Sequence, residues 1–285
     1  MKQKTIAKEF SVVGIGLHSG VDVSMVVKPA DVDTGIIFRR ADLKPAVDIK
    51  VTPLNITEAI MCTLLTKDGD QKLSVSTIEH LMSAFAMFEI DNALIEVNAP
   101  ELPVMDGSSF DYTQLLKVAG IKEQSAPRKG IKITKPIRVE LEDKFAEVLP
   151  SDNLKYEFKI KWDHPVIAAT NDHIVFDYDL DKYIEMISKA RTFGFYEQLE
   201  YLHKNNLAKG ASLDNAVGVA DDGVLNEGGL RYHDEFVRHK LLDSIGDFYV
   251  GGYIQGHFNC YKSGHTLNNQ LLQAVFAAKD SWEYI

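Results

Sequence analysis

The chain has 285 residues, of which 45% are hydrophobic and 25% are charged, and its formal net charge is -10. This composition is typical of a globular protein with one large domain or two of ordinary size. The negative charge argues against a nucleic-acid-binding surface, but a local basic pocket for an anionic small molecule remains compatible with it.

Targeting and redox signals are weak in this sequence. The first residues contain no apolar h-region, so we expect no signal peptide. No apolar run approaches the roughly 18 residues that a membrane span requires, so we expect no integral membrane segment. The only cysteines are Cys62 and Cys260, which form no disulfide framework. A cytoplasmic location with reduced thiols is the simplest expectation.

Strand-like segments dominate the beginning of the chain. Gly14–Gly20 invites a phosphate-loop interpretation, but its spacing is not G-x-G-x-x-G and an alternating strand follows it rather than a helix. A glycine-rich hairpin is therefore favoured. The extended segments expected in this region are 4–18, 21–27, 34–39, 46–51 and 59–65, the last followed by a turn over 67–70.

The pattern then changes to that of a helix. Ser76 or Thr77 can cap a helix whose apolar stripe begins at Ile78, and Glu79 and His80 lie in its first turn. The elements expected next are a strand over 92–98, a tight turn over 100–109, a helix over 110–118 that ends at Gly120, and a polar linker over 122–130.

The second half of the chain begins again with strands. The elements expected there are strands over 131–141, 145–149, 154–162 and 173–178, a helix over about 181–189, an irregular stretch over 196–225 with a strand at 216–220, a helix over 234–249, a strand over 254–261 and a last helix over 267–278.

The two halves share an order of elements: several strands, then helix, strand, turn and helix. Residue identity between them is low, so this internal repeat rests on element order. It predicts an α+β fold of two similar domains, each a β-sheet layered against two α-helices, with boundaries at 1–124 and 129–285. The helices that carry Glu79-His80 and 234–249 would then be equivalent elements, facing each other across the interface where ligand sites tend to lie.

The helix over 234–249 carries two distinct faces. Its apolar positions form one broad face, whereas His239, Asp243 and Asp247 repeat at i, i+4 and i+8 on another. A His and an Asp one turn apart can reach the same divalent cation. A solvated amphipathic helix shows the same polar stripe, so the spacing alone leaves both interpretations open.

Metal-dependent hydrolysis needs His and carboxylate ligands, an open position for water and a carboxylate base that does not bind the metal. Glu79 and His80 offer one candidate for each task, although H-E-x-x-H is absent and a first-turn Glu is commonly only a partner of the helix dipole. His265 follows Gly264 at a turn that can face a cleft, and an ordinary loop histidine is the alternative.

Six motifs, taken together, carry a resemblance to a known family. They are STIEHLM over 76–82, ELPVMDGS over 101–108, ARTFGF over 190–195, LNEGGLR over 225–231, VRHKLLD over 237–243 and KSGHTLNN over 262–269. In this order they closely resemble the UDP-3-O-acyl-N-acetylglucosamine deacetylases, the zinc amidohydrolases of lipid A synthesis that act on a linear amide. The resemblance covers nearly the whole chain.

The resemblance implies a role for each matching residue. By it, the zinc ligands are His80, His239 and Asp243, with Fe²⁺ as another metal that this ligand set accepts. Glu79 is implied as general base, His265 as general acid, Asp247 as the carboxylate that orients His265, and Thr192 as the hydroxyl that helps hold the oxyanion. Lys240 is implied at the UDP diphosphate, with Lys262 and Lys144 as further candidates.

The resemblance also implies how the substrate is bound. An insertion over about 195–225, β-α-β-like in form, would line a hydrophobic passage for the fatty acyl chain, with Phe193, Met61 and Cys62 at its mouth. Trp162 stands where the family often carries Phe as a possible uracil platform, a change that keeps stacking possible. Tyr196-Glu-Gln198 departs from the Arg-Asp pair found in many members.

The expected function is hydrolysis of the N-acetyl group of an acylated UDP-amino sugar, giving acetate and a free amine. We expect a monomer with no nucleic-acid partner. The alternative is a zinc amidohydrolase acting on a different N-acetylated sugar nucleotide. A non-catalytic UDP-sugar-binding protein would lack a ligand or a base, whereas every such position is filled here.

Overall fold

The computed structural model describes all residues from 1 to 285 and contains two five-stranded sheets of the same topology. The first has the order β2-β3-β9-β4-β5, in which only β9 and β4 are parallel. The second has the order β12-β13-β20-β14-β15, in which only β20 and β14 are parallel. The internal repeat predicted from element order is confirmed, and so is the α+β fold class.

The strands of the first sheet are β2 (Phe10–Ile15), β3 (Asp22–Pro29), β4 (Ile36–Arg40), β5 (Val47–Lys50) and β9 (Ala93–Val97). Those of the second are β12 (Ile137–Leu141), β13 (Lys144–Leu149), β14 (Lys155–Lys159), β15 (His173–Asp177) and β20 (His257–Tyr261). We refer below to the first and second repeats.

Each repeat carries a three-stranded sheet ahead of its first long helix. In the first repeat this sheet consists of β6 (Ile56–Thr57), β7 (Leu64–Lys67) and β8 (Asp70–Ser76), after the short helix η1 (Pro53–Asn55). In the second it consists of β16 (Phe193–Phe195), β17 (Val217–Ala220) and β18 (Gly223–Val224), with η3 (Tyr196–Gln198) and α5 (Leu199–Lys204) between β16 and β17.

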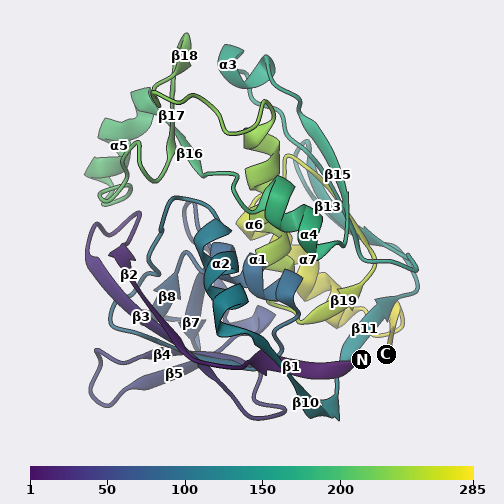
Figure 1. Ribbon diagram of the computed structural model, residues 1–285. Helices are drawn as coiled ribbons and strands as arrows, with labels where there is room; N and C mark the ends of the chain where they lie inside the picture. Colours follow the sequence, from purple (N-terminus) through teal and green to yellow (C-terminus); the bar gives the residue numbers. More distant parts are fainter.

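The long helices occupy equivalent places in the two repeats. They are α1 (Glu79–Phe88) and α2 (Phe110–Ala119) in the first, and α6 (Glu235–Tyr249) and α7 (His265–Ala277) in the second. In Figure 1, α1 and α6 lie side by side at the centre of the molecule, between the sheets of the two repeats. Helices covered on all sides must be buried around their whole circumference.

The burial of α1 and α6 follows this central position. Every residue of α1 is buried, and only Arg238 and Lys240 of α6 are not. The apolar face predicted for α6 is therefore buried, but its polar stripe is buried too. The two backbones meet at Gly246, where an added Cβ would lie 2.0 Å from the carbonyl oxygen of Glu79. The two helices can approach this closely because Gly246 has no side chain.

Replacing Gly246 by Ala is expected to lower the free energy of unfolding by about 1–3 kcal/mol, the usual cost of overpacking a core. The added methyl meets backbone atoms of Glu79 and Ser83 rather than a flexible side chain, so the two helices must separate. Denaturant unfolding measures the effect. Gly228→Ala is the control, because nothing lies within 4 Å of a Cβ at that position. Equal unfolding midpoints for the two variants would contradict the assigned contact.

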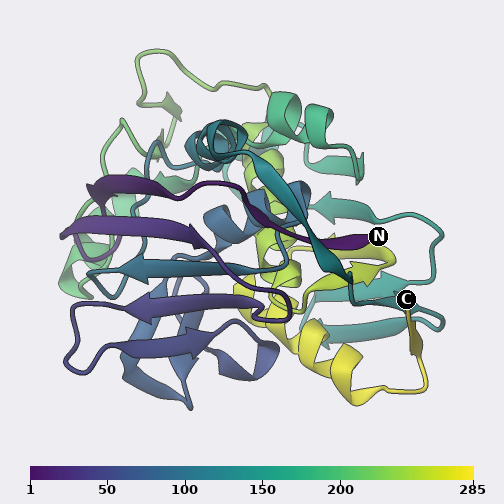
Figure 2. The same cartoon turned by 60° about the horizontal axis from the view of Figure 1, so that its bottom comes forward.

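The predicted polar linker over 122–130 is wrong. Most of it forms β10 (Ile121–Pro127), which pairs antiparallel with β1 (Lys2–Ile6). A two-stranded ribbon leaves much of its surface in water, so the polar composition that suggested a linker is also compatible with a strand. The chain then enters β11 (Gly130–Ile133), which lies between β19 (Tyr253–Gln255) and β21 (Trp282–Tyr284), and Figure 2 shows the two termini on the same side of the molecule.

The strand expected over 4–18 is divided between β1 and β2, and the strand expected over 131–141 between β11 and β12; in both cases the two parts belong to different sheets.

Further elements also differ from the prediction. The strand expected over 59–65 begins only at Leu64, because the chain bends through a left-handed Met61. The strand expected over 254–261 is divided between β19 and β20, because the side-chain-free Gly256 lies against Val148 and lets the chain pass from one sheet to another. The expected helix over 181–189 is α4 (Leu180–Lys182) followed by the π-helical turn η2 (Tyr183–Ile187), and α3 (Pro165–Ala168) was not predicted.

The predicted cap of α1 is also wrong. Thr77 has a left-handed backbone, with φ +57°, and its hydroxyl donates to the buried carboxylate of Glu101 at 3.0 Å instead of to the helix. A hydrogen bond to a carboxylate is stronger than a neutral cap, which explains the choice. None of the helices combines the length and apolar character that crossing a lipid bilayer requires.

Candidate active site

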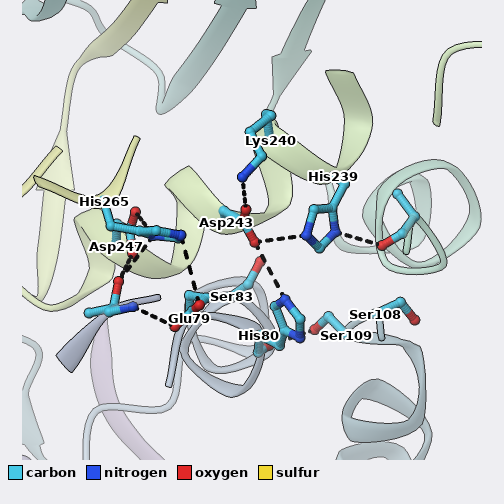
Figure 3. Close-up of polar contacts among 12 residues, drawn as sticks. Glu79, His80, Ser83, Ser108, Ser109, His239, Lys240, Asp243, Asp247 and His265 are labelled. Carbon is cyan, nitrogen blue, oxygen red and sulfur yellow. Dashed lines mark hydrogen bonds and ion pairs between the residues drawn. The ribbon is translucent and has the colours of Figure 1, made fainter. Parts of the chain in front are cut away.

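Three potential metal ligands meet where α1 and α6 pack together. His80 comes from the first turn of α1, and His239 and Asp243 lie one turn apart on α6 (Figure 3). Oδ1 of Asp243 lies 3.3 Å from Nε2 of His239 and 3.5 Å from Nε2 of His80. Donors about 2.1 Å from one tetrahedral ion lie about 3.4 Å apart, so this spacing fits a single cation.

The protonation states of these groups also suit a cation. Oδ1 of Asp243 is buried without a hydrogen-bond partner, whereas Oδ2 accepts from Nζ of Lys240 at 2.6 Å. Burial lowers the pKa of His239 to about 3, which keeps the ring neutral. Its Nδ1 lies 3.0 Å from the carbonyl oxygen of Ala190, so a proton donated there leaves Nε2 free to bind metal.

Glu79 lies beside this cluster without belonging to it. Its Oε2 accepts a hydrogen bond from the backbone N–H of Thr63 at 3.1 Å, and its Oε1 lies 3.9 Å from Nε2 of His265. Burial raises the pKa of Glu79 by more than the neighbouring His265 and His80 lower it. A carboxylate whose pKa is raised, next to a cluster of potential metal ligands, is suited to take a proton from water.

His265 opens α7, and its ring is held by Asp247 of α6 (Figure 3). Nδ1 of His265 lies 2.9 Å from Oδ2 of Asp247, which also accepts from the amide of Asn268 at 2.8 Å. Burial alone would lower the pKa of His265, but the carboxylates of Asp247 and Glu79 outweigh it and raise the pKa to about 9. The ring is therefore cationic at neutral pH and has a proton to donate.

Thr192 is fixed by contacts with both repeats. Its N–H donates to the carbonyl of Gly107 at 2.7 Å, and its own carbonyl accepts from Val217 at 2.8 Å. Gly107 has φ +83°, and an added Cβ would lie 1.9 Å from a backbone oxygen of Asn215, so only glycine fits there. In the same turn, the hydroxyl of Ser109 donates to the carbonyl of His80 at 2.8 Å.

A cavity of about 460 Å³ opens over the cluster. Among the residues predicted for the site, it is lined by Met61, Glu79, His80, Trp162, Thr192, Phe193, His239, Lys240, Asp243 and His265. The rings of Trp162 and Phe193 meet edge to face at 5.5 Å, and Nζ of Lys240 lies 5.9 Å from the centre of the Phe193 ring. Catalytic, aromatic and basic groups therefore share one space.

Four of the predicted residues lie elsewhere. Asp247 is behind His265, and the buried Cys62 lines a separate small cavity with His265. Lys262 forms an ion pair with Asp143, and neither Lys262 nor Lys144 lines the main cavity.

Several residues of the site were missed from the sequence. Leu17, Thr77, Asp163, His164, Gly194, Phe195, Glu197, Gln198 and Leu202 also line the cavity. Four of them, Asp163, His164, Gly194 and Phe195, lie within two positions of Trp162 or Phe193 along the chain, and that adjacency was the available signal. Phe195, Glu197, Gln198 and Leu202 belong to the segment 195–225 that was expected to line the acyl passage, although none was named for it.

Buried His and carboxylate ligands, with a base on one side and a charged histidine close to it, are the arrangement used by metal-dependent hydrolases. The sequence profile of one such family, described as UDP-3-O-acyl N-acetylglycosamine deacetylase, matches residues 3–277. The chain belongs to this family, and with it to the metalloenzymes.

Relatives that share nearly the full length support the assignment. A UDP-3-O-acyl-N-acetylglucosamine deacetylase of Francisella tularensis subsp. tularensis (strain WY96-3418) is 84% identical over 285 residues, covering 100% of both chains. Proteins of the same name are 49% identical in Idiomarina loihiensis, covering 100% of this chain and 93% of the relative, and 50% identical in Shewanella frigidimarina, covering 99% and 92%.

Proposed function

We propose that this chain hydrolyses the N-acetyl group of UDP-3-O-(3-hydroxyacyl)-N-acetylglucosamine, releasing acetate and the free amine, as a step of lipid A biosynthesis. One observation carries the proposal. Glu79, which can take up a proton, and His265, which can donate one, face the same cavity beside the His80–His239–Asp243 cluster. Family membership supports the choice of substrate.

We propose zinc as the metal held by His80, His239 and Asp243, with Fe²⁺ as the other ion that this ligand set accepts. A zinc ion there would polarise the acetamide carbonyl and lower the pKa of a water molecule. Burial keeps His239 neutral, and Oδ1 of Asp243 has no competing hydrogen bond, so neither ligand must first give up a partner.

The side chains around the cluster supply the proton transfers. Glu79 takes a proton from the attacking water, for which its raised pKa is suited. The hydroxyl of Thr192 donates to the carbonyl oxygen as negative charge develops there. The amine is a poor leaving group until it is protonated, and cationic His265 supplies that proton. Asp247 keeps the imidazolium in place from behind.

The rest of the cavity is assigned to the substrate. Lys240 is the basic group at the cavity wall and is proposed to meet the diphosphate, while Trp162 provides an aromatic face for uracil. Phe193 and Met61 are proposed at the entrance of the acyl passage, whose walls would come from the unit β16-α5-β17. Lys262, Lys144 and Cys62 do not line this cavity, so their proposed contacts apply to parts of the substrate that extend beyond it.

The organisation of the chain completes the proposal. We assign residues 1–124 and 129–285 to two domains, with the insertion over about 195–225 in the second. We further propose a cytoplasmic monomer that acts on a small-molecule substrate and has no nucleic-acid partner. The net charge of -10 supports the last point.

The test compares acetate release from the 3-O-acylated substrate and from UDP-N-acetylglucosamine. Each buried methylene contributes about 0.8 kcal/mol, so burial of only four of them predicts a kcat/KM about 200-fold higher for the acylated substrate. Similar kcat/KM values for both would favour the alternative, an amidohydrolase of another N-acetylated sugar nucleotide.

The metal requirement is tested separately. A chelator should abolish the activity and Zn²⁺ should restore it, and metal content per chain after exchange identifies the ion. Turnover that persists without bound metal would refute the metal-dependent mechanism.

A further inference from the structure

Thr63 is a buried residue of the site for which the mechanism above has no role. Its side chain and backbone contact both proton-transfer groups. The N–H donates to Oε2 of Glu79 at 3.1 Å, and the hydroxyl donates to Oδ1 of Asp247 at 2.5 Å. The same hydroxyl oxygen lies 3.2 Å from Nδ1 of His265.

The hairpin β7–β8 explains why Thr63 reaches these groups. In its register Leu64 lies opposite Ser76, and the pairing continues one step further, where the N–H of Thr77 donates to the carbonyl of Thr63 at 3.1 Å. Because β8 runs almost directly into α1, the residue before β7 is placed beside the first turn of α1, where Glu79 lies.

The packing of the two repeats brings the second partner. Gly246 of α6 touches the backbone of Glu79, so the next residue of α6, Asp247, lies close to the same turn of α1. A threonine hydroxyl from the first repeat can then bond to a carboxylate 184 positions later in the chain. Both oxygens of Asp247 are thereby satisfied: Oδ1 by Thr63, and Oδ2 by His265 and Asn268.

We propose that Thr63 is a positioning residue for the deacetylation, which fixes the base Glu79 and the acid pair His265–Asp247 relative to each other. This inference rests on the proposed function. The N–H engages Oε2 of Glu79 and leaves Oε1 directed toward His265. The hydroxyl fixes the rotation of the Asp247 carboxylate, and with it the plane of the imidazole. Proton-transfer groups act well only when their supporting contacts hold them in position.

The test uses two substitutions of Thr63. Thr63→Val keeps the shape of the side chain but removes the hydroxyl, and it is expected to lower kcat by about 10- to 100-fold, the range for a hydrogen bond to a charged group. KM should change by less than about twofold, because Thr63 does not line the substrate cavity. Thr63→Ser keeps the hydroxyl and should recover kcat to within a few-fold of wild type.

A double-mutant cycle separates positioning from a general effect on folding. If the hydroxyl acts through Asp247, then Thr63→Val should cost little further activity in an Asp247→Asn background. Multiplicative losses in the double variant would overturn the proposal, and so would wild-type kcat in Thr63→Val. Failure of Thr63→Ser to recover kcat would overturn it as well.

Thr66→Val is the matched control, because Thr66 is a buried residue of the adjoining strand β7, and its hydroxyl donates to the carbonyl oxygen of Asn55, away from the site. It should keep wild-type kcat. Metal content and the unfolding midpoint, measured for every variant, establish that the folded metalloprotein is compared. If the wild-type protein itself released no acetate from the acylated substrate, the proposed function would fail, and this inference with it. If the wild-type protein is active and only the Thr63 variants depart from the expected results, this inference fails and the proposed function stands.

Discussion

Glu79→Gln is expected to lower kcat by about 10²- to 10⁴-fold, the usual contribution of a general base. The substitution preserves the size of the side chain, and the amide oxygen can still accept from the N–H of Thr63. The amide cannot take up a proton from water, so the loss should appear in kcat rather than in KM. Steady-state acetate release with the 3-O-acylated substrate measures both parameters.

The interpretation of Glu79→Gln requires that the metal stays bound. Glu79 is not one of the three clustered ligands, so metal content per chain should equal that of the wild type. Asp243→Ala is the contrasting variant, because it removes a ligand and should lose both metal and activity. Glu123→Gln, an exposed change on β10, should alter neither. Turnover of Glu79→Gln within a few-fold of wild type would show that another group is the base.

The repeat could be predicted from sequence because it rests on local periodicity. Strands such as β3 and helices such as α6 show their buried face directly in the spacing of apolar residues. The order of such elements then predicted two equivalent halves, and the sheet topologies confirm it. β10 was missed because its pairing with β1 joins segments more than 100 residues apart, and its polar composition gave no local sign of a partner.

The stripe of α6 shows what periodicity leaves undecided. His239, Asp243 and Asp247 have the spacing of a solvated face and of a metal-binding face alike. Burial distinguishes the two, and burial here comes from α1, which belongs to the other repeat. Gly246 was the one local hint, since a glycine inside a helix often permits close packing.

Thr63 lies beyond the reach of sequence reasoning for a related reason. It carries no ionisable group, and the preceding residues Met61 and Cys62, although expected at the mouth of the acyl passage, give no sign of a contact with Glu79 or Asp247. Its place depends on the register of β7 with β8 and on the contact of α1 with α6. The same holds for Thr77, whose preference for Glu101 over the end of α1 appears only once the loop near residue 101 is in place. Motif residues were therefore easier to find than the residues that hold them.

The activity is expected to fall as the pH rises above about 9, and replacing His265 should remove this dependence. The pKa of His265 is raised to about 9 by Asp247 and Glu79 against the opposing effect of burial, with Asp243 as a further contributor. The cationic, proton-donating form is thus present below that pH and is lost above it. At low pH the activity should fall as Glu79, whose pKa is raised by burial, becomes protonated.

His265→Gln should lower kcat by about 10²- to 10⁴-fold, since the amine then leaves without a general acid, and the fall above pH 9 should disappear from the profile of kcat/KM. Asp247→Asn should keep the acid but remove the charge that stabilises its cation, so the descending limb should move down by about 1–3 pH units. The opposite shift, or an unchanged limb in His265→Gln, would assign that limb to another group. Because the two variants differ in whether the limb moves or vanishes, the pair separates the residue that donates the proton from the residue that keeps it charged.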